Sequence, residues 1–157
     1  TDVPVCLARG CQRVANIGEI LTPHDLPKIE AVLLINPGIA LSTKDVFNSF
    51  AQSNKKSGSG FGGPLSTRNV ANIVGLGNDL TETAASLVPQ IKLCLDELKG
   101  SQGVVAAAMS GSGASCFAFF ENREAAKITA KHLQNVGYWT QVTRILQLKT
   151  QALPQPF

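Results

Sequence analysis

Short apolar runs, separated by polar and turn-forming stretches, recur along the 157-residue chain. In the first thirty residues the runs VPVCLA, QRVANI and GEILTPHDLP are brief and alternate with turn-forming residues, so we predict β-like segments there. EAVLLIN (30–36) is rich in branched apolar residues and stops at Pro37-Gly38. This pattern predicts a buried strand that ends in a turn.

Apolar residues at the spacing of a helix begin after residue 40. IALSTKDVF predicts a short helix with apolar side chains on one face, capped by Ser42 or Thr43. LTETAASLVPQIKLCLDELKG (80–100) is strongly helical, and Pro89 within it predicts a kink or two consecutive helices, because proline lacks an amide hydrogen. A further helix is predicted to start at Asn122, where apolar residues recur every three to four positions.

The remaining apolar runs predict strands. GVVAAAM (103–109) and ASCFAFF (114–120) lie on either side of a glycine- and serine-rich stretch, and YWTQVTRI (138–145) follows as the last strand. Residues 51–66 are dominated by Ser, Gly, Asn and Lys, which predicts a flexible loop. Because strands follow strands as well as helices, the order of elements favours an α+β fold with an antiparallel sheet.

Composition narrows the class of protein and of partner. Hydrophobic residues make up 44% of the chain and charged residues 16%, which predicts a single packed domain. The net charge of +3 is too small to argue for nucleic acid, and KKSGSGFGG lacks the interleaved aromatic residues of an RNA-binding surface. Four cysteines without a C-x-x-C pair and two histidines provide no zinc site, and no apolar run is long enough to span a bilayer. We therefore expect no metal site, no nucleic-acid partner and no membrane partner.

Two glycine-rich stretches are candidate phosphate-binding sites. Residues 58–63 match G-x-G-x-x-G, but no buried strand precedes them and Pro64 follows, so a dinucleotide site is not predicted. MSGSGAS (109–115) lies between two predicted strands, and two interpretations of it stay open. Either it is a tight hairpin that needs positive φ at Gly111 and Gly113, or its backbone amides form a nest for an anion.

Together with other stretches of the chain, this segment resembles a known family. MSGSGASCFAFF is similar to the third conserved motif of the GHMP kinases, and TDVPVCLARG, NIGEIL, INPGIALSTKDVF and GLGNDL match further segments in the same order. The resemblance implies ATP-dependent phosphorylation of a hydroxyl on a cytidine-diphosphate-linked sugar alcohol of isoprenoid biosynthesis. It also implies a ferredoxin-like α+β domain over residues 1–157, with helices packed on one face of the sheet. Residues 1–20 would then be the tail of a missing N-terminal domain.

The resemblance assigns roles to particular residues. Asp2 corresponds to the proposed catalytic base, Thr43 to a polar contact with the substrate, and Phe47 to a ring that stacks on cytosine, although Phe47 could equally be a core residue. The loop beside the ATP phosphates corresponds to Ser110, Gly111, Ser112 and Gly113. Asn78 and Asp79 also match the family pattern, and we interpret them as a helix cap. ATP and Mg²⁺ are the cofactors that the family implies.

Several expectations follow from the resemblance. Asp2 and the glycine loop should converge on one phosphate-bearing ligand. The family's main nucleotide loop is not found in this sequence, so we expect the chain alone to be inactive, and exposed apolar surface leaves a homodimer open. The implied compartment is a bacterial cytoplasm or a plastid stroma. Two alternatives remain: another GHMP kinase of the homoserine or mevalonate type, and a non-catalytic α+β ligand-binding module in which 109–115 is a plain hairpin.

Overall fold

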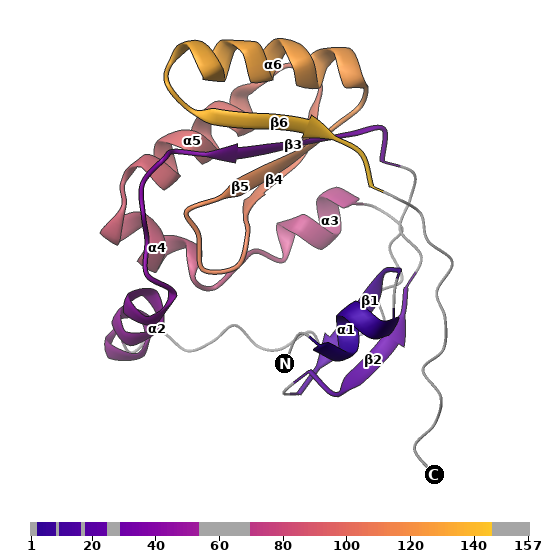
Figure 1. Ribbon diagram of the computed structural model, residues 1–157, viewed down its shortest axis with the longest axis vertical. Helices are drawn as coiled ribbons and strands as arrows, with labels where there is room; N and C mark the ends of the chain where they lie inside the picture. Colours follow the sequence, from indigo (N-terminus) through magenta and orange to yellow (C-terminus); the bar gives the residue numbers. More distant parts are fainter. Residues whose placement is uncertain (1–2, 9, 17, 25–28, 54–69, 146–157) are drawn as a thin grey trace. The chain divides into compact units, whose positions relative to one another are not determined.

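A computed structural model describes residues 3–8, 10–16, 18–24, 29–53 and 70–145 of the chain (Figure 1). It divides into two compact units, one comprising residues 1–28 with 146–157 and the other residues 29–145. The loop predicted at 51–66 falls mostly outside the described residues, and so does the glycine-rich stretch 58–63. No helix in the described ranges has both the length and the apolar character needed to cross a membrane.

The described part of the first unit holds one helix and a hairpin. Helix α1 (Val3–Ala8) precedes strands β1 (Gln12–Ala15) and β2 (Ile20–Pro23), which pair antiparallel. The prediction of a β-like segment at VPVCLA was wrong, because these residues form α1. The run lacks the polar–apolar alternation of a half-buried strand, and a proline in the first turn of a helix loses no hydrogen bond.

The second unit contains a four-stranded antiparallel sheet and five helices among its described residues. Its elements in chain order are β3 (Ala31–Asn36), α2 (Thr43–Gln52), α3 (Val70–Gly75), α4 (Thr81–Leu87), α5 (Gln90–Gly100), β4 (Val104–Met109), β5 (Cys116–Phe120), α6 (Arg123–Asn135) and β6 (Trp139–Thr143). The strand order β4-β5-β3-β6 places the first strand between the third and the fourth, as in ferredoxin-like folds. The predicted α+β class with an antiparallel sheet is therefore confirmed.

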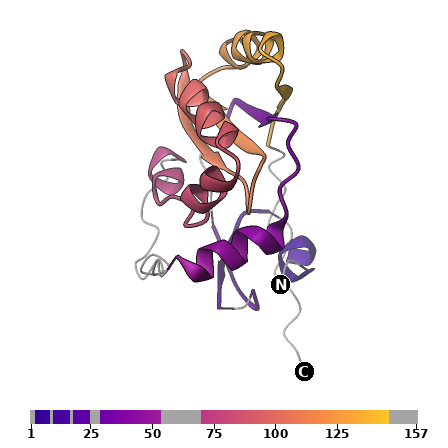
Figure 2. The same ribbon diagram turned by 90° about the vertical axis from the view of Figure 1, so that its left-hand side faces the viewer.

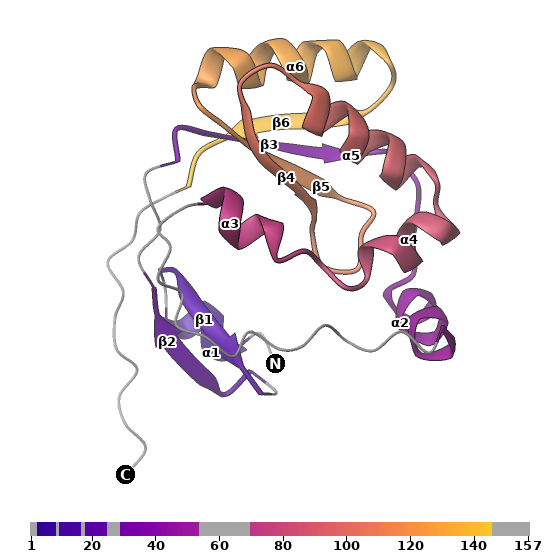
Figure 3. The same ribbon diagram turned by 180° about the vertical axis from the view of Figure 1, so that it is seen from behind.

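One face of this sheet forms the hydrophobic core. Leu33 and Ile35 of β3 are fully buried and pair with Ala118 and Cys116 of β5, and helices α5 and α6 pack against this face. Seen from behind, α5 lies in front of the strands (Figure 3). Leu34 points to the other face and is 38% exposed. The prediction that helices pack on one face of the sheet is confirmed.

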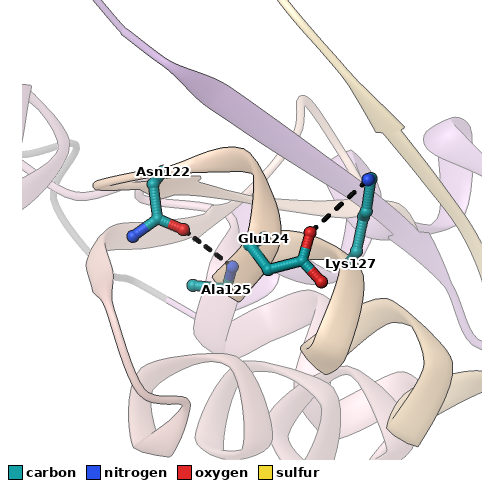
Figure 4. A network of polar contacts seen from close by, with 4 residues as sticks. All are labelled: Asn122, Glu124, Ala125 and Lys127. Carbon is teal, nitrogen blue, oxygen red and sulfur yellow. Dashed lines mark hydrogen bonds and ion pairs between the residues drawn. The ribbon is translucent and has the colours of Figure 1, made fainter.

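The ends of the helices follow the predicted caps and breaks. Ser42 caps α2 by accepting a hydrogen bond from the amide of Asp45 at 3.3 Å, which decides between the two predicted caps. Pro89 separates α4 from α5, so the stretch 80–100 is two consecutive helices. The side chain of Asn122 accepts from the amide of Ala125 at 2.9 Å and begins α6, as predicted (Figure 4).

Two buried thiols join α5 to β5 in the core. Cys94 and Cys116 are both fully buried, and the Cys94 thiol hydrogen-bonds to the Cys116 sulfur. This hydrogen bond, with a further contribution from burial, raises the pKa of Cys94 far above its usual value. Cys94 therefore has almost no thiolate at neutral pH.

We expect this pair to be chemically silent in the folded protein. A disulfide-exchange reagent such as DTNB should modify the exposed Cys6 rapidly, whereas Cys94 and Cys116 should react only after denaturant is added, because both sulfurs are buried and the reagent must reach them. Mass spectrometry after timed labelling measures the order of modification, and Cys6→Ala is the control that removes the fast phase. Rapid native labelling at Cys94 or Cys116 would contradict the packing described here.

Candidate functional site

The loop between β4 and β5 closes as a tight turn. The amide of Ser110 donates to the carbonyl of Ser115 at 2.9 Å, and the amide of Gly113 donates to the carbonyl of Ser110 at 3.0 Å. Gly111 has φ +55° and Gly113 has φ +89°, whereas Ser112 is not among the described residues with positive φ. Positive φ at the second turn position, without positive φ at the third, is the φ pattern of a type II′ turn. The predicted positive φ values at both glycines are confirmed.

Backbone amides at the top of this turn are available to a ligand. Within the described part of the chain, the amides of Gly111 and Ser112 donate to no other group. Gly111 is exposed and Ser112 half-buried. Neighbouring amides without acceptors on a glycine turn are the elements from which anion sites are built. A hairpin and an anion nest are thus compatible in this loop.

Side chains from three other segments hold the loop. Thr43, the first residue of α2, shares a hydrogen bond of 2.8 Å with the hydroxyl of Ser112. Asn36, at the end of β3, donates to the hydroxyl of Ser115 at 2.9 Å. Asn78 donates to the carbonyl of Gly111 at 2.8 Å. The tip of the β4–β5 hairpin consequently lies beside α2 (Figures 1 and 2).

The far side of the turn is anchored in the core. A β-carbon added to Gly113 would lie 2.9 Å from the sulfur of Met109 and 3.3 Å from methyl groups of Ile91 and Leu41. Ala114, the next residue, is only 5% exposed. Gly111 is therefore exposed to solvent, whereas Gly113 is packed tightly. The core residues around Gly113 restrict the conformation of the loop.

The structure brings together some of the predicted site residues. Thr43 contacts the loop directly, and Phe47 follows one turn later on α2 with 54% of its surface exposed. The possibility that Phe47 is a core residue is thereby removed. Asp2 lies outside the described residues, so the predicted convergence of Asp2 with the loop stays a prediction.

Asn78 differs from its predicted role as a helix cap. Its side-chain oxygen accepts from the amide of Leu80 at 3.0 Å, but the residue that caps α4 is Leu80, which makes no side-chain cap bond. Asn78 thus lies two positions before the cap and supports the helix start through a local turn. Sequence reasoning missed its contacts with the loop and missed Asn36 entirely, although Asn36-Pro37-Gly38 is a visible turn signal.

Asn78 also lines a cavity of about 450 Å³, whose other walls come from α3, the start of α4, α5 and β4. Its walls include small residues of β4 together with Thr81 and Lys99. Across the described ranges, no three His, Cys, Asp or Glu side chains gather closely enough to hold a metal ion. We therefore assign no metal ligand to this part of the chain.

A family model gives the class of this part of the chain. Residues 66–138 match the family model described as GHMP kinases C terminal, and they belong to that kinase family. The resemblance seen in the sequence is confirmed.

Particular members of the family are similar to nearly the whole chain. It is 37% identical over 150 residues to the 4-diphosphocytidyl-2-C-methyl-D-erythritol kinase of Cereibacter sphaeroides (strain KD131 / KCTC 12085), covering 92% of this chain and 54% of that protein. It is 38% identical over 155 residues to the kinase of the same name from Anaplasma marginale (strain Florida), covering 94% and 52%. A crystal structure of 4-(cytidine 5'-diphospho)-2C-methyl-D-erythritol kinase superposes with a TM-score of 0.65 at 25% identity, covering 90% of this chain and 53% of that one. The chain spans about half the length of the curated relatives that it matches.

Proposed function

We propose that this chain is the C-terminal part of an ATP-dependent kinase that phosphorylates the 2-hydroxyl of 4-diphosphocytidyl-2-C-methyl-D-erythritol in the non-mevalonate isoprenoid pathway. The observation that carries the proposal is the similarity to kinases of that name over more than nine tenths of the chain. The unpartnered amides at the top of the β4–β5 turn support it, because phosphoryl transfer depends mainly on positioning and on neutralising phosphate charge.

In this proposal each part of the site has a defined task. The amides of Gly111 and Ser112 donate to phosphate oxygens, with Ser110 and Gly113 closing the turn that presents them. Asp2 accepts or orients the proton of the substrate hydroxyl, as a carboxylate beside a reacting alcohol can. The expected cofactors are ATP and Mg²⁺; the amide pair suits the phosphates of ATP, and we assign no residue to Mg²⁺.

Thr43 and Phe47 belong to the substrate side of the site. Both project from α2, four residues apart, which places them on one helical face. The hydroxyl of Thr43 already lies beside the loop through its bond with Ser112, and the exposed ring of Phe47 is free to stack on a base. We infer that α2 orients the cytidine substrate relative to the phosphate loop.

Replacing Phe47 with alanine in the full-length protein should raise the KM for the cytidine substrate by roughly 5- to 150-fold, since stacking of a base on an aromatic ring contributes about 1–3 kcal/mol. The KM for ATP and the melting temperature should change little, because Phe47 is more than half exposed. Steady-state kinetics with each substrate varied in turn measures the effect. Leu93→Ala on α5, an apolar residue 57% exposed, is the matched control. Equal effects of the two changes would remove Phe47 from the site.

A substrate panel tests the proposed activity itself. The full-length protein is incubated with labelled ATP and the cytidine substrate, homoserine or mevalonate, and the phosphorylated product is quantified. We expect transfer to the cytidine substrate, whereas transfer to homoserine or mevalonate would favour the corresponding alternative kinase. Absence of transfer to all three would favour a non-catalytic ligand-binding module.

In the same assay we expect the 157-residue chain alone to be inactive. The homodimer and the compartment, a bacterial cytoplasm or a plastid stroma, stay predictions.

A further inference from the structure

Both ends of the Asn78 side-chain amide are hydrogen-bonded, each to a different part of the fold. Its amide nitrogen donates to the carbonyl of Gly111 at 2.8 Å and to the carbonyl of Met109 at 3.2 Å. Its oxygen accepts from the amide of Leu80 at the start of α4. Helix α4 thus fixes the oxygen end of the amide group, while the nitrogen end reaches 33 residues along the chain to the glycine loop. This arrangement is more than helix capping requires.

These contacts determine where the amides of the turn point. In a trans peptide the carbonyl and the following amide hydrogen point in opposite directions. Because the carbonyl of Met109 points at Asn78, the amide of Ser110 points away from it, and that amide indeed donates to Ser115 on the β5 side. The same relation holds one peptide later. With the carbonyl of Gly111 held by Asn78, the unpartnered amide of Ser112 points away from Asn78.

The peptide between Gly111 and Ser112 is the one that needs such a restraint. In a two-residue turn, rotation of the central peptide interconverts types II′ and I′ and reverses the direction of its amide. Glycine at position 111 allows this rotation more readily than any other residue would, and only the positive φ then required at Ser112 opposes it. The hydrogen bond from Asn78 adds a second restraint and acts directly on the rotating carbonyl.

We propose that Asn78 is a positioning residue for phosphoryl transfer, which directs the Ser112 amide toward the transferred phosphoryl group by holding the Gly111 carbonyl. This inference rests on the proposed function. It assigns to Asn78 a role in the reaction beyond its support of the α4 start. Asn78 contacts no substrate itself; its effect passes through one peptide group.

The test separates the helix contact from the loop contact. In Asn78→Ser the hydroxyl can still accept from the Leu80 amide, because serine forms the same local turn, but it is too short to hold both loop carbonyls. Asn78→Ala loses both contacts. In the full-length protein we expect kcat to fall about 10- to 100-fold in both variants, below the 10²–10³-fold cost of deleting a transition-state donor outright. The KM for the alcohol substrate should be unchanged, and only Asn78→Ala should lower the melting temperature appreciably.

A second pair of variants tests the Ser112 amide itself. Ser112→Pro removes the amide hydrogen at a position where φ is already negative, and Ser112→Ala removes only the hydroxyl and its bond to Thr43. The ratio of kcat between these two variants therefore measures the contribution of the amide. We expect Ser112→Pro to be at least tenfold slower than Ser112→Ala.

The outcomes distinguish the two levels of the proposal. A slow Ser112→Pro variant together with an Asn78→Ser variant of wild-type kcat would overturn the role of Asn78 and leave the phosphate loop intact. Equal kcat for Ser112→Pro and Ser112→Ala would remove the loop amide from the reaction, and with it the inference about Asn78. A fall in kcat of Asn78→Ser that only follows loss of folded protein, as measured by its melting curve, would reduce Asn78 to a structural residue.

Discussion

Gly113→Ala should destabilise the protein by about 2–6 kcal/mol, considerably more than Gly111→Ala, although the two glycines lie in one turn. Two costs add at Gly113. Its φ of +89° is strained for any residue with a β-carbon, which costs about 1–3 kcal/mol. The new methyl group would also meet the Met109 sulfur at 2.9 Å inside a filled core, and overpacking of that kind costs about 1–3 kcal/mol.

Gly111→Ala is the matched control for this prediction. Gly111 has a positive φ of +55°, but a β-carbon there would have nothing within 4 Å, so only the backbone cost of about 1–3 kcal/mol applies. Equilibrium unfolding in urea measures both variants, and the midpoint of Gly113→Ala should be clearly the lower. Equal midpoints would show that the packing around Gly113 contributes nothing to stability.

The second large effect concerns Asp2. If its carboxylate accepts or orients the proton of the substrate hydroxyl, Asp2→Asn in the full-length protein should lower kcat by about 10²–10⁴-fold, the range typical of general acid–base groups. Asparagine has the same shape but cannot accept the proton, so the KM values for ATP and substrate should change little. Rapid-quench measurement of product formation reports the chemical step directly.

Asp96→Asn provides the control for a lost carboxylate. Asp96 lies on α5, is exposed, and pairs with Lys92 at 2.6 Å one turn away. Such an exposed pair contributes only about 0.3–0.5 kcal/mol, so its removal should leave kcat unchanged. An Asp2→Asn enzyme that retains more than a tenth of wild-type kcat would limit Asp2 to a minor role.

The sheet and most helices could be predicted because their signals are local. EAVLLIN is apolar and branched along its whole length, and in the structure it pairs with strands on both sides as β3. Pro89 interrupts the 80–100 stretch for a covalent reason, because its ring removes the amide hydrogen and crowds the preceding turn. Helix α1 was mistaken for an extended segment because six residues with a proline carry too little periodicity to distinguish the two. Helix α3 was not predicted, since it is equally short and directly follows the stretch that was interpreted as a loop.

Only part of the candidate site could be predicted from the sequence. The two glycines marked the turn, because their conformational freedom is a property of the residues themselves. The hydrogen bonds that orient the turn depend on tertiary structure: Asn36 and Ser115 are 79 residues apart, and Thr43 and Ser112 are 69 apart. No local pattern reports such contacts. The environment of Phe47 was undecided for the same reason, because an aromatic ring on a helix suits a core and a binding surface equally.

The way the β4–β5 turn is supported links ligand recognition to cooperative folding. The hairpin joins strands that are neighbours in sequence, so it can form early from local contacts. The residues that orient the backbone of the turn come from β3, α2 and the segment before α4. They contact the turn only when the whole sheet has assembled. If the turn binds phosphate as proposed, a partly folded chain would contain the bend without the backbone orientation that binding needs. Nucleotide binding would then report completion of the native state rather than the presence of any one element.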